Sequence, residues 1–307
     1  MKKYQKQVII FFFLCFIWAN NYAMNYYSDY IEYAEKAFDQ KRYEDAGTYY
    51  DMAFQRWQGY KEHLYEASRA WAYFGDKEQA FYYANRAVEM RFYDRNKILN
   101  DEPYKNGLGS NYLDLILVKI QIESASFERG INDSLRQVLL NIAGRNDELR
   151  KGKERKRIDS LFADRNCLEN QNYWAKVKEN DRLNVEIFIQ LYSDHGWPDI
   201  RLVGEKANKT ACFIVQHADS LIQKRFLPVI EQSCQRNETP WKYYAHLYDR
   251  IIADVKGKVK FGCEPIYNPT TGSVSMVFEN PGCVNYYREQ MGLPPLDNFS
   301  FDLPCSD

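Results

Sequence analysis

The chain has 307 residues, enough for two domains, and its 45% apolar and 27% charged residues are typical of a globular protein, which excludes a chain disordered throughout. Its 41 basic and 42 acidic residues give a formal net charge of -1. This balance provides no general attraction to nucleic acid or to anionic lipid, so we expect no nucleic-acid partner.

The first residues are typical of an export signal. A basic segment, Met1 to Lys6, precedes an apolar run of 12 residues from Val8 to Ala19. A membrane-spanning helix needs about 20 apolar residues, so the run predicts a signal peptide over residues 1–23 and no membrane span after its removal. An uncleaved anchor is the alternative, because Asn21 is larger than the residue usually found near a cleavage site. Either way, the sequence predicts export to the periplasm or cell envelope, or secretion.

A pattern made mostly of small residues recurs after 34 residues in the next segment. Small side chains at this spacing lie where two antiparallel helices touch, because larger ones would push the axes beyond about 8 to 10 Å. The positions are Ala46, Tyr50 and Ala53 in the first copy and Ala80, Ala84 and Ala87 in the second. The period resembles that of the tetratricopeptide repeat, which implies helical hairpins that bind a protein or peptide partner.

The repeat pattern fades in a third helix pair that begins near Asn96. A run of turn-forming residues then follows, from Asn100 to Gly107. We therefore place a domain boundary near Gly109. The tetratricopeptide-like repeats occupy residues 24–109, and a second domain occupies residues 110–307.

Most of the second domain has helical spacing of apolar residues. The expected helices cover 111–141, a stretch through Val177 that ends at the Gly196-Trp197-Pro198 break, and 205–223. The charged stretch 145–157 mixes both signs, which favours a solvated helix face or linker. Thr239 before Pro240 predicts the start of another helix, and Gly257 its end.

Beyond Gly257 the apolar period changes from helical spacing to two. Val259, Phe261 and Cys263 alternate with polar residues, a turn is expected at 268–272, and a second alternating run follows. This predicts a β-hairpin. The predicted fold is mainly α, with N-terminal tetratricopeptide-type helical hairpins followed by an α-rich α+β domain with a small antiparallel β-hairpin.

Six cysteines remain after signal removal, all in the second half. An even number in an exported chain is compatible with disulfides, and buried free thiols are the alternative. No Cys-x-x-Cys pair occurs, and we expect no metal or cofactor. The six are Cys167, Cys212, Cys234, Cys263, Cys283 and Cys305.

Few residues in the chain suggest chemistry. No serine-nucleophile elbow, zinc-binding histidine pair or phosphate-binding glycine loop is present. His217 and Asp219 are close in sequence, but residues two apart on a helix point about 200° apart, so we do not expect both to bind one metal. His246 and Arg250, four residues apart, share a helix face.

The order of short motifs along the second half resembles the domain-of-unknown-function 6624 family. The resemblance covers roughly residues 160 to 299 and implies a helical domain without an assigned activity. Members tend to have Tyr-Gly-Thr-Gln where this chain has Phe261-Gly262-Cys263-Glu264. The motifs are Asp181-x-x-Asn184, Gly196-Trp197-Pro198, Val203-Gly204, Gln216-His217-Ala218-Asp219, Leu227-Pro228, Leu247-Tyr248-Asp249-Arg250, Phe261-Gly262, Arg288 and Gly292-Leu293-Pro294-Pro295-Leu296.

Carried over residue by residue, the resemblance implies six candidate pocket residues: His217, Asp219, Asp249, Arg250, Glu264 and Arg288. Two functions follow from the sequence. The favoured one is a non-enzymatic envelope protein whose repeats bind a protein or peptide. The alternative is a hydrolase in which His217 is the general acid or base and Arg250 or Arg288 holds an anionic group.

Overall fold

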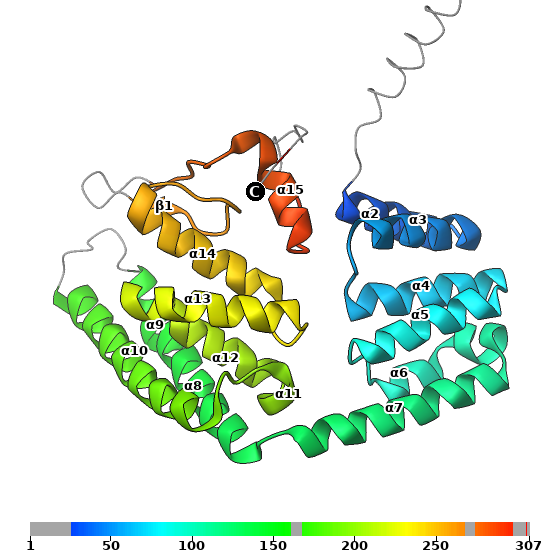
Figure 1. The fold of residues 1–307 in the computed structure, drawn as a ribbon, viewed down its shortest axis with the longest axis horizontal. Coiled ribbons are helices and arrows are strands. Elements are labelled where there is room, and N and C mark those ends of the chain that lie inside the picture. The colour runs from blue at the N-terminus through cyan, green and yellow to red at the C-terminus, as the bar shows by residue number, and fades with distance from the viewer. Residues whose placement is uncertain (1–25, 161–167, 268–273, 297–304, 306–307) are drawn as a thin grey trace, which may run out of the picture.

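The computed structural model describes residues 26–160, 168–267, 274–296 and 305. The described part is mainly helical, with 14 α-helices and one small pair of strands. Figure 1 shows two groups of helices, α2 to α6 and α8 to α15, bridged by the long helix α7. The predicted signal peptide, residues 1–23, lies outside the described residues.

The N-terminal group begins with four helices packed as consecutive antiparallel pairs. They are α2 (Tyr27–Asp39), α3 (Tyr43–Arg56), α4 (Lys61–Phe74) and α5 (Lys77–Glu89). The residues of the 34-residue pattern lie in the contacts between them and are almost completely buried: Ala46, Tyr50, Ala53, Ala80, Ala84 and Ala87. The predicted helical character of this region is therefore confirmed.

Local sequence explains the turn between α4 and α5. Gly75 ends α4 in the left-handed conformation with φ of 100°, which glycine adopts without a Cβ penalty. The Asp76 side chain then accepts a 3.0 Å hydrogen bond from the backbone N–H of Gln79 and caps α5. This short connection requires α5 to run back along α4.

The N-terminal core continues past the repeats. Two short elements, α6 (Arg95–Asn100) and the π-helix η1 (Tyr104–Leu108), lead into α7 (Ser110–Gly130). Ile116 and Ile120 of α7 are buried in the same hydrophobic cluster as the N-terminal helices. The first half of α7 thus packs with the preceding helices, and its second half leads to the C-terminal group.

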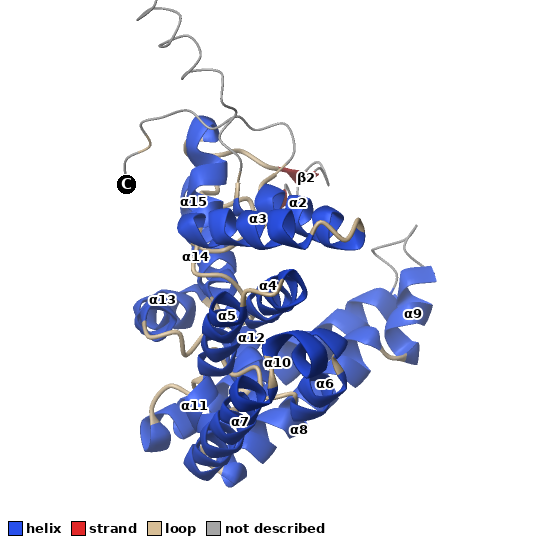
Figure 2. Ribbon diagram, turned by 90° about the vertical axis from the view of Figure 1, so that its right-hand side faces the viewer, coloured by secondary structure: helices blue, strands red, loops and turns tan. Residues whose placement is uncertain are grey.

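The C-terminal group surrounds a core in which Phe188 and Phe226 contact each other at a centroid distance of 5.1 Å. Figure 2 shows that helix dominates this group as well. Its elements are α8 (Asp133–Lys151), α9 (Lys153–Ser160), α10 (Leu168–His195), α11 (Ile200–Val203), α12 (Glu205–Gln216), α13 (Ser220–Gln235), α14 (Trp241–Lys256), β1 (Ile266–Tyr267), β2 (Val274–Ser275), the 3-10 helix η2 (Pro281–Cys283) and α15 (Val284–Gln290).

The single helix predicted over residues 205–223 is wrong, because two helices occupy this stretch. Helix α12 ends at Gln216, and Asp219 is the N-cap of α13. The Asp219 carboxylate accepts 2.9 Å hydrogen bonds from the backbone N–H groups of Leu221 and Ile222. Aspartate favours this cap over the helix interior, and the cap starts a new helix.

The predicted N-cap role of Thr239 is also wrong. Pro240 occupies the N-cap position of α14. The Thr239 hydroxyl instead accepts hydrogen bonds from the Trp197 Nε1 at 3.1 Å and from the Asn208 Nδ2 at 3.0 Å. Buried polar groups require partners, so the Thr239 hydroxyl pairs with donors in the core and does not cap α14. Gly257 ends α14 with φ of 62°, as predicted.

The β-hairpin is smaller than predicted. Strands β1 and β2 pair antiparallel with Ile266 opposite Ser275 and Tyr267 opposite Val274. The alternating residues 259–263 form no strand with β2, although Val259 makes an isolated bridge to Phe278. The turn expected at 268–272 lies outside the described residues. A small antiparallel pair is confirmed, and its expected length is not.

The cysteines divide between the two alternatives. Cys283 and Cys305 form a disulfide. Cys212, Cys234 and Cys263 are free thiols. Cys167 lies outside the described residues.

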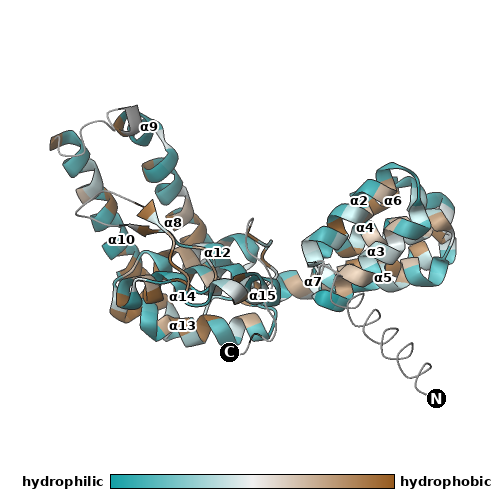
Figure 3. Cartoon of the chain, turned by 90° about the horizontal axis from the view of Figure 1, so that it is seen from above, coloured by the Kyte–Doolittle hydropathy of each residue, from teal (hydrophilic) through white to brown (hydrophobic). Residues whose placement is uncertain are grey.

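The two helical groups contact each other through the C-terminal end of α15. Glu289 accepts a 3.1 Å hydrogen bond from the backbone N–H of Tyr27 and lies 3.3 Å from the Arg56 guanidinium. The Tyr60 hydroxyl donates to the Gly292 carbonyl at 2.7 Å. Seen from above in Figure 3, hydrophilic and hydrophobic residues are mixed along the helices, as amphipathic helices require. No described helix is long and apolar enough to cross a membrane.

Candidate functional site

A polar cluster lies where the end of α12, the middle of α14 and the loop before β1 meet. We call it the Glu264 cluster, and it consists of Gln216, His217, His246, Arg250 and Glu264. Glu264 is its centre. One carboxylate oxygen accepts a 2.7 Å hydrogen bond from the Gln216 Nε2 and lies 3.2 Å from the His246 Nδ1. The other accepts a 3.2 Å hydrogen bond from Arg250.

Glu264 is ionised at neutral pH in this setting. Its side chain is only 15% exposed, and burial alone would raise its pKa. The hydrogen bond with His246 and the charge of Arg250 outweigh burial and lower the pKa below its ordinary value. Arg250 also donates a 2.8 Å hydrogen bond to the Gln216 carbonyl at the end of α12. One guanidinium thus joins α14, α12 and the Glu264 loop.

His217 adds an imidazole to the cluster. Its ring lies 4.2 Å from the Phe213 ring, measured between centroids. Burial, together with the charges of Arg150 and Arg250, lowers the pKa of His217 to about 4. Among the described residues, no side chain forms a hydrogen bond with either ring nitrogen.

Helices α8 and α10 supply a layer behind His217. The Arg150 guanidinium lies over the Phe213 ring at 5.2 Å and pairs with Asp181 at 2.6 Å. One turn away, the Asn146 side-chain carbonyl accepts hydrogen bonds from Asn184 at 3.0 Å. Asp181 and Asn184 of the first sequence motif therefore lie behind the cluster. They connect α10 to α8.

Arg150 is a residue that the sequence reasoning missed. The charged stretch 145–157 was expected to be a solvated face or linker, but the Arg150 side chain is only 19% exposed and paired. The expectation is wrong at this position because Arg150 lies near the end of α8, one side of which packs on α10 and α12. The signal that would have identified it is Asp181 of the Asp181-x-x-Asn184 motif, because a partly buried carboxylate requires a basic partner.

Asp249 does not enter the cluster. Its carboxylate is fully buried and accepts hydrogen bonds from three backbone N–H groups: Lys260 at 2.8 Å, Phe261 at 3.0 Å and Cys263 at 2.8 Å. Burial raises the pKa of Asp249, while these backbone hydrogen bonds oppose the rise. Asp249 therefore holds the loop that ends at Glu264.

Arg288 holds the same loop from the other side. Its guanidinium donates 2.6 Å hydrogen bonds to the Phe261 carbonyl and to the Pro294 carbonyl. Of the six residues expected to form a pocket, the structure thus brings His217, Arg250 and Glu264 together. Asp249 and Arg288 position the loop, and Asp219 caps α13 two residues after His217.

The cluster, together with Arg150 behind it, offers a neutral imidazole, two guanidinium groups and an ionised carboxylate. This set can bind an anionic group and can accept a proton from a bound hydroxyl. In the described part of the chain, no three His, Cys, Asp or Glu residues are grouped so that they could hold a metal ion.

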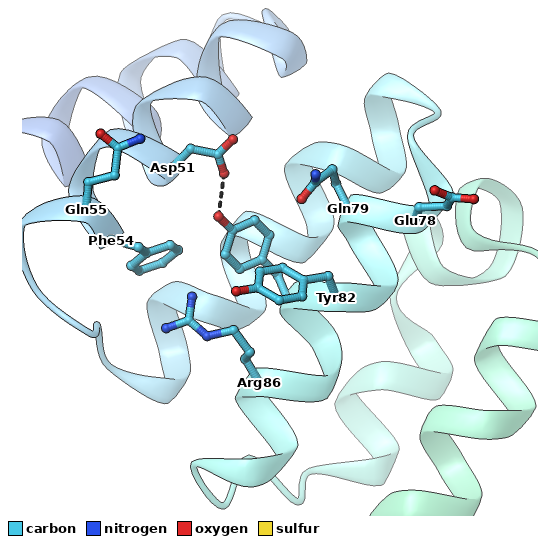
Figure 4. Close-up of a pocket in the computed structure, with 8 residues that line it drawn as sticks. Asp51, Phe54, Gln55, Glu78, Gln79, Tyr82 and Arg86 are labelled. Carbon is cyan, nitrogen blue, oxygen red and sulfur yellow. Dashed lines mark hydrogen bonds between the residues drawn. The ribbon is translucent and has the colours of Figure 1, made fainter.

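A second candidate site is a groove between α3 and α5, shown in Figure 4. The groove is open to solvent and has a volume of about 610 Å³. The Tyr83 hydroxyl donates a 2.5 Å hydrogen bond to Asp51 at one side. At the other side, the Arg86 guanidinium lies over the rings of Phe54 at 5.5 Å and Tyr82 at 5.6 Å. The remaining lining residues are Gln55, Glu78 and Gln79.

Comparison with known proteins identifies the second half of the chain. Residues 155–303 match the model of a family of unknown function, DUF6624. The match confirms the resemblance that the motif order predicted. No curated protein and no solved structure matches the chain significantly.

Proposed function

We propose that this protein is an exported binding protein whose N-terminal helical hairpins, of the tetratricopeptide type, bind an extended peptide segment of a partner protein. The observation that carries the proposal is the groove between α3 and α5, which combines the exposed ring of Tyr82 with charges of both signs (Figure 4). The C-terminal domain of unknown function serves in this proposal as a fused binding or structural module.

The groove has the chemistry that peptide recognition requires. The Tyr82 side chain is 51% exposed and presents a ring for an apolar side chain. Gln55 and Gln79 are exposed, and their side-chain amides can both donate to and accept from a peptide backbone. Asp51 and Glu78 favour a basic side chain on the bound peptide.

The test is selection from a displayed library of random peptides with the purified mature chain. Enriched peptides should carry an aromatic or aliphatic residue near a basic one. Replacement Tyr82→Ala should weaken their binding at least tenfold, or about 1.4 kcal/mol, because the ring is the most exposed apolar group of the groove. The matched control Phe74→Ala, another exposed aromatic residue of this group, should bind like the unmodified chain.

If Tyr82→Ala left the binding of the selected peptides unchanged, the groove would not be the peptide-binding site. Melting temperatures of both variants, measured in parallel, show that any loss of binding does not come from unfolding. Because Tyr82 is half exposed, both should melt close to the unmodified chain.

A second function, hydrolysis of an anionic substrate, is favoured by one observation at the Glu264 cluster. His217 is neutral at pH 7, has no side-chain hydrogen-bond partner among the described residues, and lies near Arg150 and Arg250. In this proposal His217 accepts a proton from water while Arg250 holds the anionic group. A panel of p-nitrophenyl esters and phosphate esters tests it, and turnover retained by His217→Ala would exclude the mechanism.

Export is part of the proposal and is tested separately. We expect the protein purified from its native host to lack residues 1–23, because a basic segment and a short apolar run direct cleavage. Mass spectrometry of the intact chain and of its N-terminal peptide measures this directly. A chain that begins at Met1 in the cytoplasmic fraction would contradict export, whereas one that begins at Met1 in the membrane fraction would indicate the uncleaved anchor.

A further inference from the structure

We propose a separate binding site for a small organic anion, one that carries a carboxylate or phosphate on an aromatic body, in the cleft between the two helical groups. The cleft has a volume of about 410 Å³, within the range of small-molecule sites. It is distinct from the groove between α3 and α5 and from the Glu264 cluster. Its walls come from both halves of the chain, including Trp57 and Arg91 on one side and Lys209 and Trp241 on the other.

Arg91 is the residue that indicates an anionic ligand. It lies just after α5, and its Nε is buried without a hydrogen-bond partner in the described part of the chain. Within the described residues it donates one hydrogen bond, from Nη2 to the Asn237 carbonyl at 3.0 Å, and no carboxylate lies within 4.0 Å of its guanidinium. A partly buried guanidinium that lacks a counter-charge is costly, and an anion in the cleft would supply that charge.

The two carboxylates that act on Arg91 are engaged elsewhere, and Glu62, a third carboxylate of the cleft lining, is exposed and is not among the charges that act on Arg91. Glu205 pairs with Lys61 at 2.5 Å across the two helical groups. Glu238 pairs with Arg236 at 2.6 Å. Both carboxylates act on Arg91 only at longer range. The positive charge of Arg91 is therefore not neutralised by a direct contact within the described residues.

Three lysines increase the positive potential of the cleft. Lys206, Lys209 and Lys242 are exposed along its wall, and the first two lie one turn apart on α12. None of them forms an ion pair with a described residue. With Arg91 they outnumber the two carboxylates of the lining, Glu62 and Glu205, and this excess of positive charge favours an anion with two or three oxygen atoms.

Aromatic rings define the rest of the ligand. Trp57 and Tyr60 contact each other at a centroid distance of 4.7 Å on the N-terminal side, and Trp241 lies on the C-terminal side. All three line the cleft. Such rings pack favourably against an aromatic or apolar body. An anion without such a body would contact only the cationic residues of the cleft and not its aromatic rings. A ring-bearing anion is therefore the ligand that fits best.

The experiment titrates the full mature chain by calorimetry with phenyl phosphate and phenylacetate, and with phenol and inorganic phosphate as the matched partial ligands. We expect one ring-bearing anion or both to bind at least tenfold more tightly than phenol and than inorganic phosphate. The stronger of the two anions identifies the headgroup as phosphate or carboxylate. Equal binding of phenol would overturn the proposal, because the charge would then play no part.

Variants assign the binding to this cleft. Arg91→Gln should weaken the binding of the favoured anion at least tenfold. Trp241→Leu should also weaken this binding but should leave the binding of inorganic phosphate unchanged. The matched control is Arg182→Gln, an exposed arginine on α10 that is remote from the cleft lining. Unchanged affinity in both Arg91→Gln and Trp241→Leu would refute the site. Thermal melts of each variant without ligand separate loss of binding from loss of folding, and the Trp241→Leu result stands if Arg91→Gln fails to fold.

Discussion

Replacement of Asp249 by asparagine should lower the free energy of unfolding by about 3 kcal/mol. The carboxylate is fully buried and accepts hydrogen bonds from the backbone N–H groups of Lys260, Phe261 and Cys263. Hydrogen bonds to a charged acceptor are each worth about 1.5 to 3 kcal/mol, and a buried donor without a partner costs about 1 to 3 kcal/mol. Asparagine keeps one acceptor oxygen but places an amide N–H₂ against one of these donors.

Urea unfolding measures the effect as a shift of the midpoint at constant slope. The matched control is Asp254→Asn, an exposed aspartate on the same helix, which should change stability by no more than about 0.5 kcal/mol. Equal midpoints for Asp249→Asn and the control would show that Asp249 does not hold the loop. Because this loop ends at Glu264, the variant should also lose the tight contacts of the Glu264 cluster.

The helical hairpins could be predicted because their signals are local. Ala46 and Ala80 recur at a fixed spacing, and Gly75 followed by Asp76 specifies a helix end and a helix start within two residues. Such signals depend on neighbours in the chain and on the helix period. They need no knowledge of distant segments.

Two of the errors involve partners that are distant in sequence. Phe261 alternates like a strand residue, but its backbone N–H donates to Asp249, 12 residues earlier, and this takes the place of a strand ladder. Thr239 looks like a helix cap, but Trp197 and Asn208 reach its hydroxyl from other elements. In each case a buried hydrogen bond from a tertiary contact decided the local structure.

At the candidate site, the sequence identified the residues but not the role of each residue. The motif order identified His217, Arg250 and Glu264, which lie together, but it equally identified Asp249 and Arg288, which bind backbone groups of one loop. A motif names residues that matter for the domain. It does not distinguish a side chain that faces a ligand from one that positions a loop, because that difference lies in the direction of the side chain.

The free energy of unfolding should fall as the pH is lowered from about 6.5 to about 4, and His217 should be a main cause. Its folded pKa is lowered to about 4 by burial and then by Arg150 and Arg250, whereas the unfolded chain titrates near the ordinary value of 6.5. Between these values the unfolded state binds a proton that the folded state does not, so acid favours unfolding. Because one pKa unit corresponds to about 1.4 kcal/mol, the full effect is about 3 kcal/mol.

The variant His217→Gln should remove this part of the acid sensitivity. Urea midpoints of the variant and the unmodified chain should agree at pH 7, because the neutral imidazole has no side-chain hydrogen-bond partner among the described residues. At pH 4.5 the two midpoints should differ, and the variant should be the more stable. The control is His63→Gln. Burial lowers the pKa of His63 too, so this variant loses the acid sensitivity that comes from His63 and keeps the acid sensitivity that comes from His217. A large loss of stability at pH 7 in His217→Gln would instead identify a structural histidine. An anion bound near Arg150 and Arg250 would offset their charges and raise the pKa of His217, so the pKa followed by NMR during a titration with phenyl phosphate reports whether the Glu264 cluster binds anions.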